Sequence, residues 1–283
     1  MMLNRSRQII PFLGILLVCA VAVLSVDYLF MTEEGDRQAE ITATEHGSDY
    51  IEVDAHVIHV DPVNERLTFR LDFIPHGKFD AGDGLLAVPL EVSVSSIGAE
   101  QLHFESERRM FPHEVIVDMF EGEVEDYPFD KHRALFEILI LEEGKSQAVP
   151  TELDLFANHH GYIFVDEVLP DSSHGYLGYD IHLQRSALVI GTVLFCMVII
   201  WGLMIVNMFI FWLVLKDKME VDLGLFGYMS GFIVALFFFR QIFPDVPPFL
   251  GVFADYASFF WAELVTAGIS IGLALKWFNK FGK

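Results

Sequence analysis

Histidines and carboxylates at short spacing are the side chains in this sequence that could bind a metal ion. In the run HVIHVD, His56, His59 and Asp61 offer the nitrogen and oxygen donors that divalent metals prefer. Residues three apart on a strand point to opposite faces, so His56 and His59 cannot chelate one ion unless a bulge lies between them. Asp54 and His56 share a face, but two ligands do not complete a site. We therefore expect neither a metal site nor a cofactor.

Catalysis would need a defined constellation of side chains, and the sequence contains none of the common ones. It has no glycine-rich phosphate loop, nucleophile elbow or paired-histidine zinc motif. The adjacent acids Glu125-Asp126 and Glu142-Glu143 do not define a catalytic pair without further geometry. We predict that the protein has no catalytic residues and is not an enzyme.

Three polar residues, Asn207, Asp255 and Glu263, stand inside long apolar runs. A charge in mid-membrane costs about 3 kcal/mol, so Glu263 is expected to face a helix bundle, a partner or water. The alternative is a neutral glutamic acid that hydrogen-bonds a neighbouring helix. Asn207 is expected to form a hydrogen bond between helices.

Two small-residue pairs, Gly227-x-x-x-Gly231 and Gly268-x-x-x-Gly272, predict close approach of other helices. Together with the polar residues they indicate a packed bundle. They also favour a homo-oligomer or a complex with another membrane protein.

Four apolar runs are long enough to cross a bilayer, which needs about 20 residues of helix. We predict a cytoplasmic N-terminus with a first span in 1–31, further spans at 187–215, 223–240 and 249–275, and a cytoplasmic tail at 276–283. The first apolar run, 9–26, would suit a signal peptide or an uncleaved anchor. The lack of a small-x-small cleavage site favours the anchor.

Charge is strongly segregated along the chain. Residues 32–186 hold 33 acids against 10 bases and all eleven histidines, so this segment reads as a separate acidic domain. An electronegative domain repels phosphate, which excludes nucleic acid as a main partner. The short segments that would share one side of the membrane carry seven bases, whereas the outer loop 240–248 has a single base. The positive-inside rule therefore puts both termini in the cytoplasm and residues 32–186 outside. We expect an integral protein of the plasma (inner) membrane whose first partner is the lipid bilayer.

The exported acids and histidines have two interpretations. Histidine titrates near neutrality and nearby carboxylates raise its pKa, which would make the domain sensitive to protons. The alternative is an acidic surface that keeps the domain soluble.

Residues 32–186 alternate apolar and polar side chains at the period of a β-strand. Strands are expected at 51–57, 67–73, 86–94, 115–120, 134–141, 162–168 and 176–183, after a polar tether at 32–48. Seven or eight short strands separated by Gly, Pro and Asp predict an antiparallel β-sandwich. The predicted fold class is a β + α membrane protein, an exported sandwich joined to a four-helix transmembrane region.

The tetrapeptide Tyr127-Pro128-Phe129-Asp130 has a local physical interpretation. Proline fixes its own backbone angle and holds the preceding residue extended, so the two aromatic rings are placed to pack. Asp130 can accept hydrogen bonds within the turn or pair with a base. Arg185, at the boundary of the second span, is the candidate base.

Two stretches resemble a family of microbial membrane proteins known only as a domain of unknown function. The first is this tetrapeptide with the strand-like 131–141. The second comprises 235–240, 243–248, Gly251, Asp255 and 259–263, and its outer loop contains Arg240, Pro244, Asp245, Pro247 and Pro248. The resemblance implies one N-terminal span, an exported domain and three C-terminal spans, and it implies no activity.

The chain also has a more distant similarity to pentameric ligand-gated ion channels. Their exported β-sandwich carries an aromatic-Pro-x-Asp loop, like residues 127–130, and an arginine just before the first span, like Arg185. The similarity implies that these five residues form a coupling junction and that 223–240 is the pore-equivalent helix. The chain departs from the channels in having no span after residue 275 and in the bulky run 237–239.

Two functions from different classes stay open at this point. In the first, the extracytoplasmic β domain binds a partner or ligand in an accessory or scaffold role. In the second, a pentameric assembly responds to a ligand or to protons as a channel does.

Overall fold

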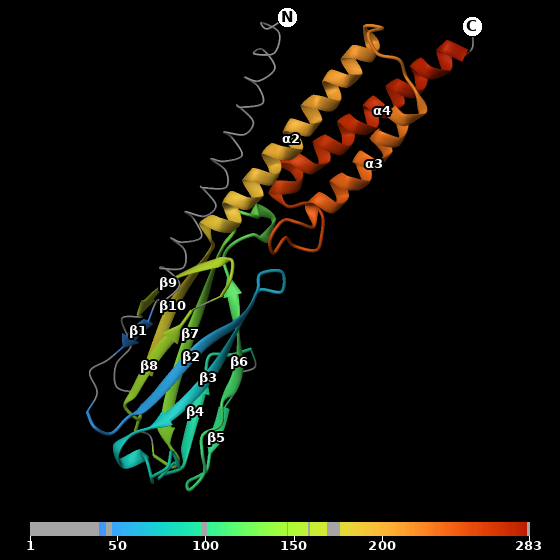
Figure 1. The fold of residues 1–283 in the computed structure, drawn as a ribbon. Coiled ribbons are helices and arrows are strands. Elements are labelled where there is room, and N and C mark those ends of the chain that lie inside the picture. The colour runs from blue at the N-terminus through green and yellow to red at the C-terminus, as the bar shows by residue number, and fades with distance from the viewer. Residues whose placement is uncertain are drawn as a thin grey trace, which may run out of the picture. The chain divides into compact units, whose positions relative to one another are not determined.

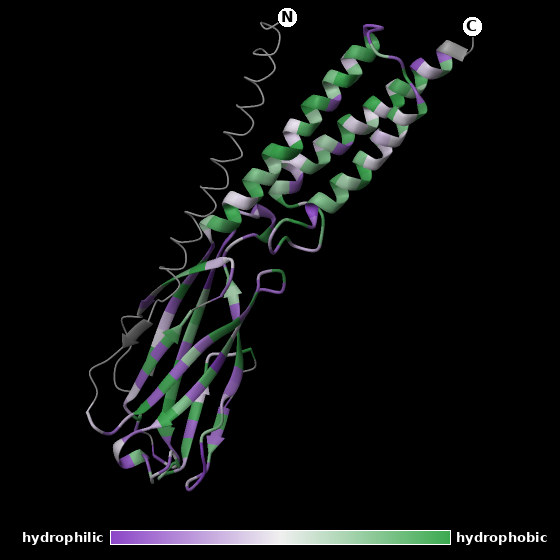
Figure 2. Cartoon of the chain, viewed as in Figure 1, coloured by the Kyte–Doolittle hydropathy of each residue, from purple (hydrophilic) through white to green (hydrophobic). Residues whose placement is uncertain are grey.

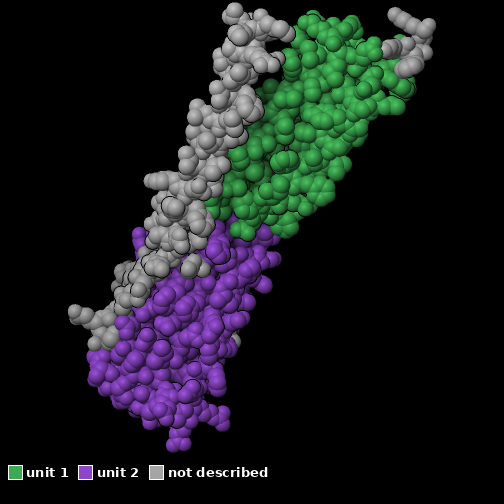
Figure 3. Space-filling view, in the orientation of Figure 1, with its two compact units in different colours: residues 1–31, 125–129, 187–283 green, residues 32–124, 130–186 purple. Residues whose placement is uncertain are grey.

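The computed structural model describes residues 40–43, 47–97, 101–145, 147–157, 159–168 and 176–281, and the chain divides into two compact units (Figures 1 and 3). The β unit contains the described residues up to 124 together with those in 130–186. The helical unit contains 125–129 and the described residues from 187 onward. A five-residue loop from the β-rich half of the sequence therefore belongs to the helical unit. The predicted first span lies outside the described residues.

The strands of the β unit are short and follow one another closely (Figure 1). They are β1 (Glu40–Ala43), β2 (Ile51–Asp61), β3 (Arg66–Pro75), β4 (Leu90–Val94), β5 (Gln101–Phe104), β6 (His113–Phe120), β7 (Lys131–Glu142), β8 (Thr151–Phe156), β9 (Tyr162–Val168) and β10 (Tyr176–Arg185).

Hydrogen bonding joins the strands in the order β1-β8-β2-β3-β6-β7-β10-β9, and β4 pairs with both β5 and β7. The pairings are antiparallel except that of β2 with β8, which is parallel from Ile51↔Thr151 to His56↔Phe156. The sheet is mixed, so the prediction of a purely antiparallel domain was wrong at this pair. A parallel pair needs a long connection, and β3 to β7 supply it.

One hydrophobic core fills the β unit. Phe69 of β3 and Phe136 of β7 do not lie on paired strands, yet their ring centroids are 4.8 Å apart. The hydroxyl of Tyr179 in β10 donates to the carbonyl of Leu153 in β8 at 3.2 Å, again across strands that do not pair. The sheet therefore closes over a shared core into which alternate side chains point, as the period-two pattern predicts.

The predicted strands are largely confirmed, and the differences have local reasons. Residues 40–43, predicted as part of a tether, form β1 beside β8. Residues 86–89 lie outside β4, because Leu86 makes an isolated bridge with Asp80 and residues 87–89 pair with no strand. β5 and β8 were not predicted, since stretches of four and six residues carry too little alternation to stand out.

The helical unit contains α2 (Ala187–Leu215), α3 (Leu223–Arg240) and α4 (Phe260–Phe281), with a π-helical turn at Asp255–Phe259 just before α4. These helices are long and apolar enough to cross a membrane, counting the π-turn with α4 (Figure 2). The bounds of α2 and α3 are those predicted from the apolar runs. The described chain is thus a mixed β domain followed by three helices suited to a membrane.

The helix that corresponds to the fourth predicted span, 249–275, begins and ends later in the sequence than predicted. Residues 249–252 lie in a loop, where Gly251 has a φ of 119° and the N–H groups of Gly251 and Val252 donate to the carboxylate of Asp255. At its other end α4 runs through Lys276 to Phe281, into the predicted tail. Charged residues end an apolar run, but lysine is a good helix former and does not end a helix.

α4 packs against both α2 and α3. A hydrogen bond also joins α2 to α3, because the hydroxyl of Tyr228 donates to Oδ1 of the buried Asn207 at 2.8 Å. The predicted interhelical bond of Asn207 is confirmed.

Of the four glycines predicted to allow close packing, Gly272 does so within the chain. A Cβ atom there would lie 2.6 Å from the ring of Phe211 in α2. At Gly227, Gly231 and Gly268 a Cβ would meet no described atom within 4 Å. The described part of the chain therefore supplies no close helix at these three positions.

Gly122 and Gly144 provide a matched test of a tight turn in the β unit. Both have a positive φ, 99° and 76°, but only at Gly122 would a Cβ collide with backbone, 1.7 Å from the carbonyl oxygen of Lys131. We expect Gly122→Ala to lower the free energy of unfolding by at least about 2 kcal/mol more than Gly144→Ala. Urea unfolding of the full-length protein in mild detergent measures the difference. Equal losses would show that Gly122 does not need its close approach to Lys131.

Candidate functional site

The loop between β6 and β7 contributes its central residues to the helical unit. After a 3₁₀ turn at Val124–Asp126 comes Tyr127, which is fully buried in the apolar cluster of the helices. Its hydroxyl donates to the carbonyl of Pro244 at 2.6 Å, and its own carbonyl accepts from the N–H of Ala254 at 3.2 Å. Tyr127 therefore holds both ends of the segment between α3 and α4.

The residues after Tyr127 continue this packing. Pro128 is buried, and the peptide bond before it is cis. The ring of Phe129 meets that of Phe253 edge-on, with centroids 5.7 Å apart. Both aromatic residues beside the proline thus pack on the segment between α3 and α4.

Asp130, the next residue, lies in the β unit and forms a buried ion pair with Arg185. Nε of Arg185 is 3.0 Å from each carboxylate oxygen, and neither side chain has exposed area. Nε2 of His132 donates to Oδ2 of Asp130 at 3.1 Å, and the guanidinium of Arg185 lies 4.4 Å from the ring centroid of Tyr162. Of the two roles left open for Asp130, a hydrogen bond within the turn or a pair with a base, the structure shows the pair, with Arg185 as the base.

The strand register explains why these residues meet. β7 and β10 pair antiparallel and include Gln184↔Lys131, so the residue before β7 comes next to the last residue of β10. On the other side of β10, Arg185 lies directly opposite Tyr162 of β9. The site is therefore made at the ends of three neighbouring strands.

Burial alone would raise the pKa of Asp130, but hydrogen bonds from His132 and Arg185 lower this pKa below its ordinary value. The carboxylate is consequently ionised at neutral pH and its charge is balanced inside the domain. Such a pair adds little net stability compared with an apolar replacement, whereas removal of one partner leaves an uncompensated buried charge. Its contribution is a fixed geometry.

A second buried ion pair closes the segment between α3 and α4. Arg240 donates from Nε to Oδ1 of Asp255 at 2.7 Å and from Nη2 to Oδ2 at 3.0 Å. Nη2 also donates to the carbonyls of Pro247 at 3.1 Å and Phe249 at 2.6 Å. Arg240 and Asp255 cannot be recognised as a pair from the sequence, because nothing in a spacing of 15 residues indicates that a loop folds back to join them.

Two family models match the chain. One, described as a domain of unknown function (DUF4436), matches residues 41–183, and the other, also described as a domain of unknown function (DUF8686), matches residues 185–280. The chain belongs to the DUF4436 family. The predicted membership of an uncharacterised family is confirmed, and neither description names a channel. Comparison with curated proteins gives no match.

The boundary between the two matches falls at Arg185, two residues before the helical unit resumes at Ala187. The loop 125–129 lies inside the DUF4436 match although it packs with the helices. The matched region thus includes the segment that the β domain contributes to the helical unit.

The remaining predicted site residues take no part in the two ion pairs. Asp245 and Pro248 are exposed in the segment between α3 and α4. Glu263 is partly exposed in the first turn of α4 and makes no hydrogen bond or ion pair with the described residues.

An acidic patch, which sequence reasoning missed, lies on the outward face of the DUF4436 region. The register of β2 with β8 and β3 puts Asp54 opposite both Asp154 and Asp72, and Glu52 opposite Glu152. Carboxylate oxygens of Glu52, Asp54 and Asp154 lie within 4.8 Å of one another. Oxygen donors at this spacing suit a hard cation such as Ca²⁺. Like charges directly opposite one another are destabilising.

β2 also contains the bulge that the histidine interpretation required. The register shifts between Val57 and His59, so Val57 and Val60 both point inward while His56 and His59 share the outer face. Within the described residues, however, no third ligand joins these histidines to form a metal-binding group.

His132 and Tyr162 are the junction residues that sequence reasoning missed. His132 follows Asp130 by two positions and so shares its face of the strand, a signal that the sequence does contain. Tyr162 is placed by the pairing of β9 with β10, which no local pattern gives. The acidic patch depends in the same way on the parallel pairing of β2 with β8.

Asp130 and Asp180 each pair with an arginine in the β unit, one in a buried and one in a partly exposed setting. Nε of Arg133 donates to Oδ1 of Asp180 at 2.7 Å, and the Arg133 side chain is 31% exposed. Asp130→Asn leaves the buried Arg185 without its counter-charge, and we expect a loss of about 3–5 kcal/mol in unfolding free energy. Asp180→Asn should lose about 1 kcal/mol. Urea unfolding of both variants in detergent checks this, and losses of similar size would contradict the special role of the buried pair.

The acidic patch predicts a pH dependence of stability. Burial, Glu52 and Asp154 raise the pKa of Asp54 in the folded protein. Its stabilising contribution is therefore complete below the ordinary aspartate pKa of about 4 and is lost as the pH rises through the raised value. We expect Asp54→Asn to unfold at higher temperature than the wild type at pH 7, and this advantage to shrink on acidification to pH 4.

Asp61 is the control, because its pKa is lowered in the folded protein whereas that of Asp54 is raised. Asn64 donates to the carboxylate of Asp61 from its backbone N–H at 3.0 Å and from its Nδ2 at 2.7 Å. Burial favours a higher pKa for Asp61, but these hydrogen bonds lower it. Its contribution is present above the ordinary value and lost as the pH falls through the lowered one. Asp61→Asn should thus destabilise the protein at pH 7. Melting curves from pH 4 to 8 with a metal chelator test both variants, and the same sign for both would refute the electrostatic account.

Proposed function

We propose that the protein is a non-enzymatic membrane protein whose extracytoplasmic β domain binds a partner or ligand and transmits the bound state to its helices. In this proposal residues 32–186 lie outside the plasma (inner) membrane and both termini lie in the cytoplasm, following the positive-inside rule. The carboxylates aligned on β2, β3 and β8 favour a basic or cationic partner, because opposite charge speeds and orients encounter.

The observation that carries this proposal is the place of the Asp130–Arg185 pair in the chain. The described chain passes between its two units at 124/125, 129/130 and 186/187. Asp130 stands at the second of these points and Arg185 just before the third, and their side chains meet at 3.0 Å. A shift of β7 or β10 on binding would act through covalent bonds on loop 125–129 and on the start of α2 together.

Within the helical unit the effect has a defined route. Tyr127 bonds to the carbonyl of Pro244 and the N–H of Ala254, so a movement of the loop would displace both ends of the segment between α3 and α4. The Arg240–Asp255 pair ties that segment to both helices. Buried pairs of this kind repack between discrete arrangements instead of deforming gradually, which suits a two-state response.

Hydrogen exchange tests the coupling. We expect Asp130→Asn to speed exchange in residues 125–129 and in the first turns of α2, since both are held by the pair. Asp180→Asn, which breaks the Arg133 pair, should speed exchange only in β7 and β10. Unchanged exchange in residues 125–129 and α2 of the Asp130 variant would sink the coupling proposal.

The second candidate function is a pentameric ligand- or proton-gated channel-like protein. The observation that favours it is that the aspartate of the aromatic-Pro-x-Asp loop meets the arginine just before α2. Gly227, Gly231 and Gly268, whose Cβ positions are open within the described chain, would then pack against helices of other copies.

Bilayer conductance and mass separate the two candidates. The channel-like function requires currents from purified protein between pH 4 and 8 and a pentameric mass in mild detergent. A binding or accessory role requires a stoichiometric partner that co-purifies from native membranes. Silent bilayers together with a monomeric mass would exclude the channel-like function.

A further inference from the structure

Three aromatic side chains are exposed at the end of the helical unit that contains the segment between α3 and α4. They are Phe129 of the β6–β7 loop, Phe253 of that segment and Tyr256 of the π-turn, and each is between 45% and 61% exposed. The rings of Phe129 and Phe253 are in contact, and Tyr256 follows Phe253 by three residues, a spacing at which helical residues are neighbours. Clustered exposed apolar surface of this kind marks a site of interaction with a protein or a membrane.

The exposed apolar surface continues from these rings along α4. The ring of Tyr256 contacts that of Phe260, with centroids 5.2 Å apart. Exposed residues without charge then follow at spacings of three and four to the other end of the helix, namely Leu264, Gly268, Ile271, Leu275 and Phe278. In a helix that crosses a bilayer, such a face lies against the acyl chains. The aromatic cluster is therefore one end of a face that lipid would cover.

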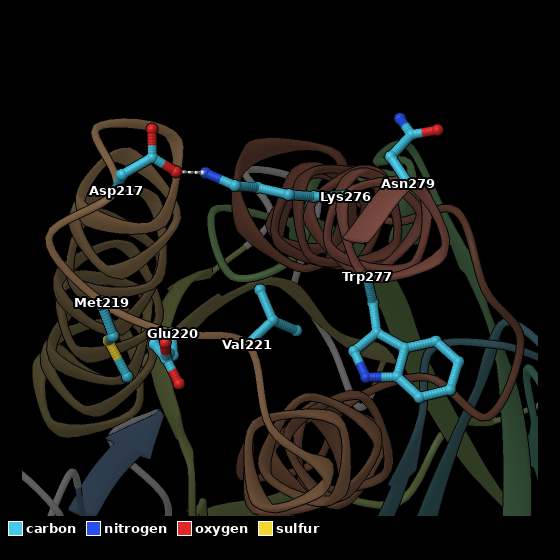
Figure 4. Close-up of a pocket in the computed structure, with 7 residues that line it drawn as sticks. All are labelled: Asp217, Met219, Glu220, Val221, Lys276, Trp277 and Asn279. Carbon is cyan, nitrogen blue, oxygen red and sulfur yellow. Dashed lines mark hydrogen bonds and ion pairs between the residues drawn. The ribbon is translucent and has the colours of Figure 1, made fainter. Parts of the chain in front are cut away.

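The length of α2 indicates the depth of the cluster. The ammonium of Lys276 in α4 donates to the carbonyl of Val214 and, at 2.8 Å, to Oδ1 of Asp217, so α4 is tied to the last turn of α2 (Figure 4). About 20 residues counted back from Leu215 cross a hydrocarbon core about 30 Å thick. Since α2 has 29 residues and is about 44 Å long, its first turns extend beyond the core at the other end.

The segment between α3 and α4 packs with these first turns. α3 has 18 residues, about 27 Å of helix, and so reaches the outer boundary of the core where it ends at Arg240. Val193, in the second turn of α2, shares one buried apolar cluster with Phe243 of the segment and with Tyr127. Phe129, two residues after Tyr127, is therefore expected where hydrocarbon meets the headgroups. Aromatic side chains are favoured at this boundary.

We propose that Phe129, Phe253 and Tyr256 form a lipid-binding surface at the outer boundary of the bilayer. The inference rests on the membrane arrangement proposed above. The loop that ends at Asp130 then contacts two different environments, because Tyr127 packs within the helical unit and Phe129 packs against lipid. The outer leaflet thus acts directly on the loop that adjoins the buried ion pair.

Collision rates of a spin label test this surface. A nitroxide is attached at Phe129→Cys or Phe253→Cys in the full-length protein, reconstituted in nanodiscs, with Cys19→Ala and Cys196→Ala to remove the native thiols. Lipid contact predicts faster relaxation by O₂, which concentrates in the bilayer, than by the nickel complex NiEDDA, which stays in water. The two positions report separately, so Phe253→Cys still tests the surface if Phe129→Cys does not fold.

Two matched controls bracket the result. Phe111→Cys replaces an aromatic side chain of the β unit that is 73% exposed, and its label should relax faster with NiEDDA than with O₂. Leu264→Cys lies on the exposed face of α4, deeper in the predicted span, and should give a larger ratio of O₂ to NiEDDA relaxation than Phe129→Cys.

Two results would overturn the proposal. Faster relaxation by NiEDDA at Phe129 and Phe253 would show that water covers them. Slow relaxation by both reagents would show that protein covers them, either a second copy or the predicted first span. The Leu264 control separates these failures from that of the membrane arrangement. Preference for O₂ at Leu264 leaves the arrangement intact, whereas preference for NiEDDA there would overturn it as well.

Discussion

The buried pair of Asp130 and Arg185 constrains the parts of the chain around it. Two charges removed from water are tolerated only when their remaining polar contacts are made inside the protein. His132 donates to the same carboxylate and Tyr162 lies against the guanidinium, so strands β7, β9 and β10 must end in register for the pair to exist. Loop 125–129 ends immediately before Asp130, and helix α2 starts two residues after Arg185, so both segments of the helical unit adjoin the pair in the chain.

The helical unit contains a second buried ion pair between an arginine and an aspartate. Arg240 joins the end of α3 to Asp255, and its guanidinium also collects two backbone carbonyls from the intervening loop. A guanidinium can donate to both oxygens of a carboxylate and to two carbonyls, whereas a lysine ammonium has three protons for these four contacts. Tyr127 bonds into the same loop. The loop is thus held by polar contacts that an apolar bundle alone would not supply.

On the outer face of the β domain, carboxylates lie opposite other carboxylates, in contrast to the two buried ion pairs. Carboxylates of β2, β3 and β8 lie directly opposite one another, an arrangement that destabilises a sheet. Departures from local stability of this kind are expected where a surface serves binding. The same acids were visible in the sequence as net charge, but their concentration on one face arises only from the pairing of three strands.

The sequence by itself determined the elements that depend on local pattern. Apolar runs gave α2 and α3 to the residue and alternation gave the longer strands, whereas Asp130 and Arg185 could be named only as candidates for a pair. Only the tertiary structure decided what depends on distant segments meeting. The parallel pairing of β2 with β8 created the acidic patch, the folding back of a loop joined Arg240 to Asp255, and strand register put Tyr162 against Arg185. Hydrophobic periodicity is a property of neighbouring residues, whereas register and loop closure are set by the packing of the whole chain, which no short window of sequence contains.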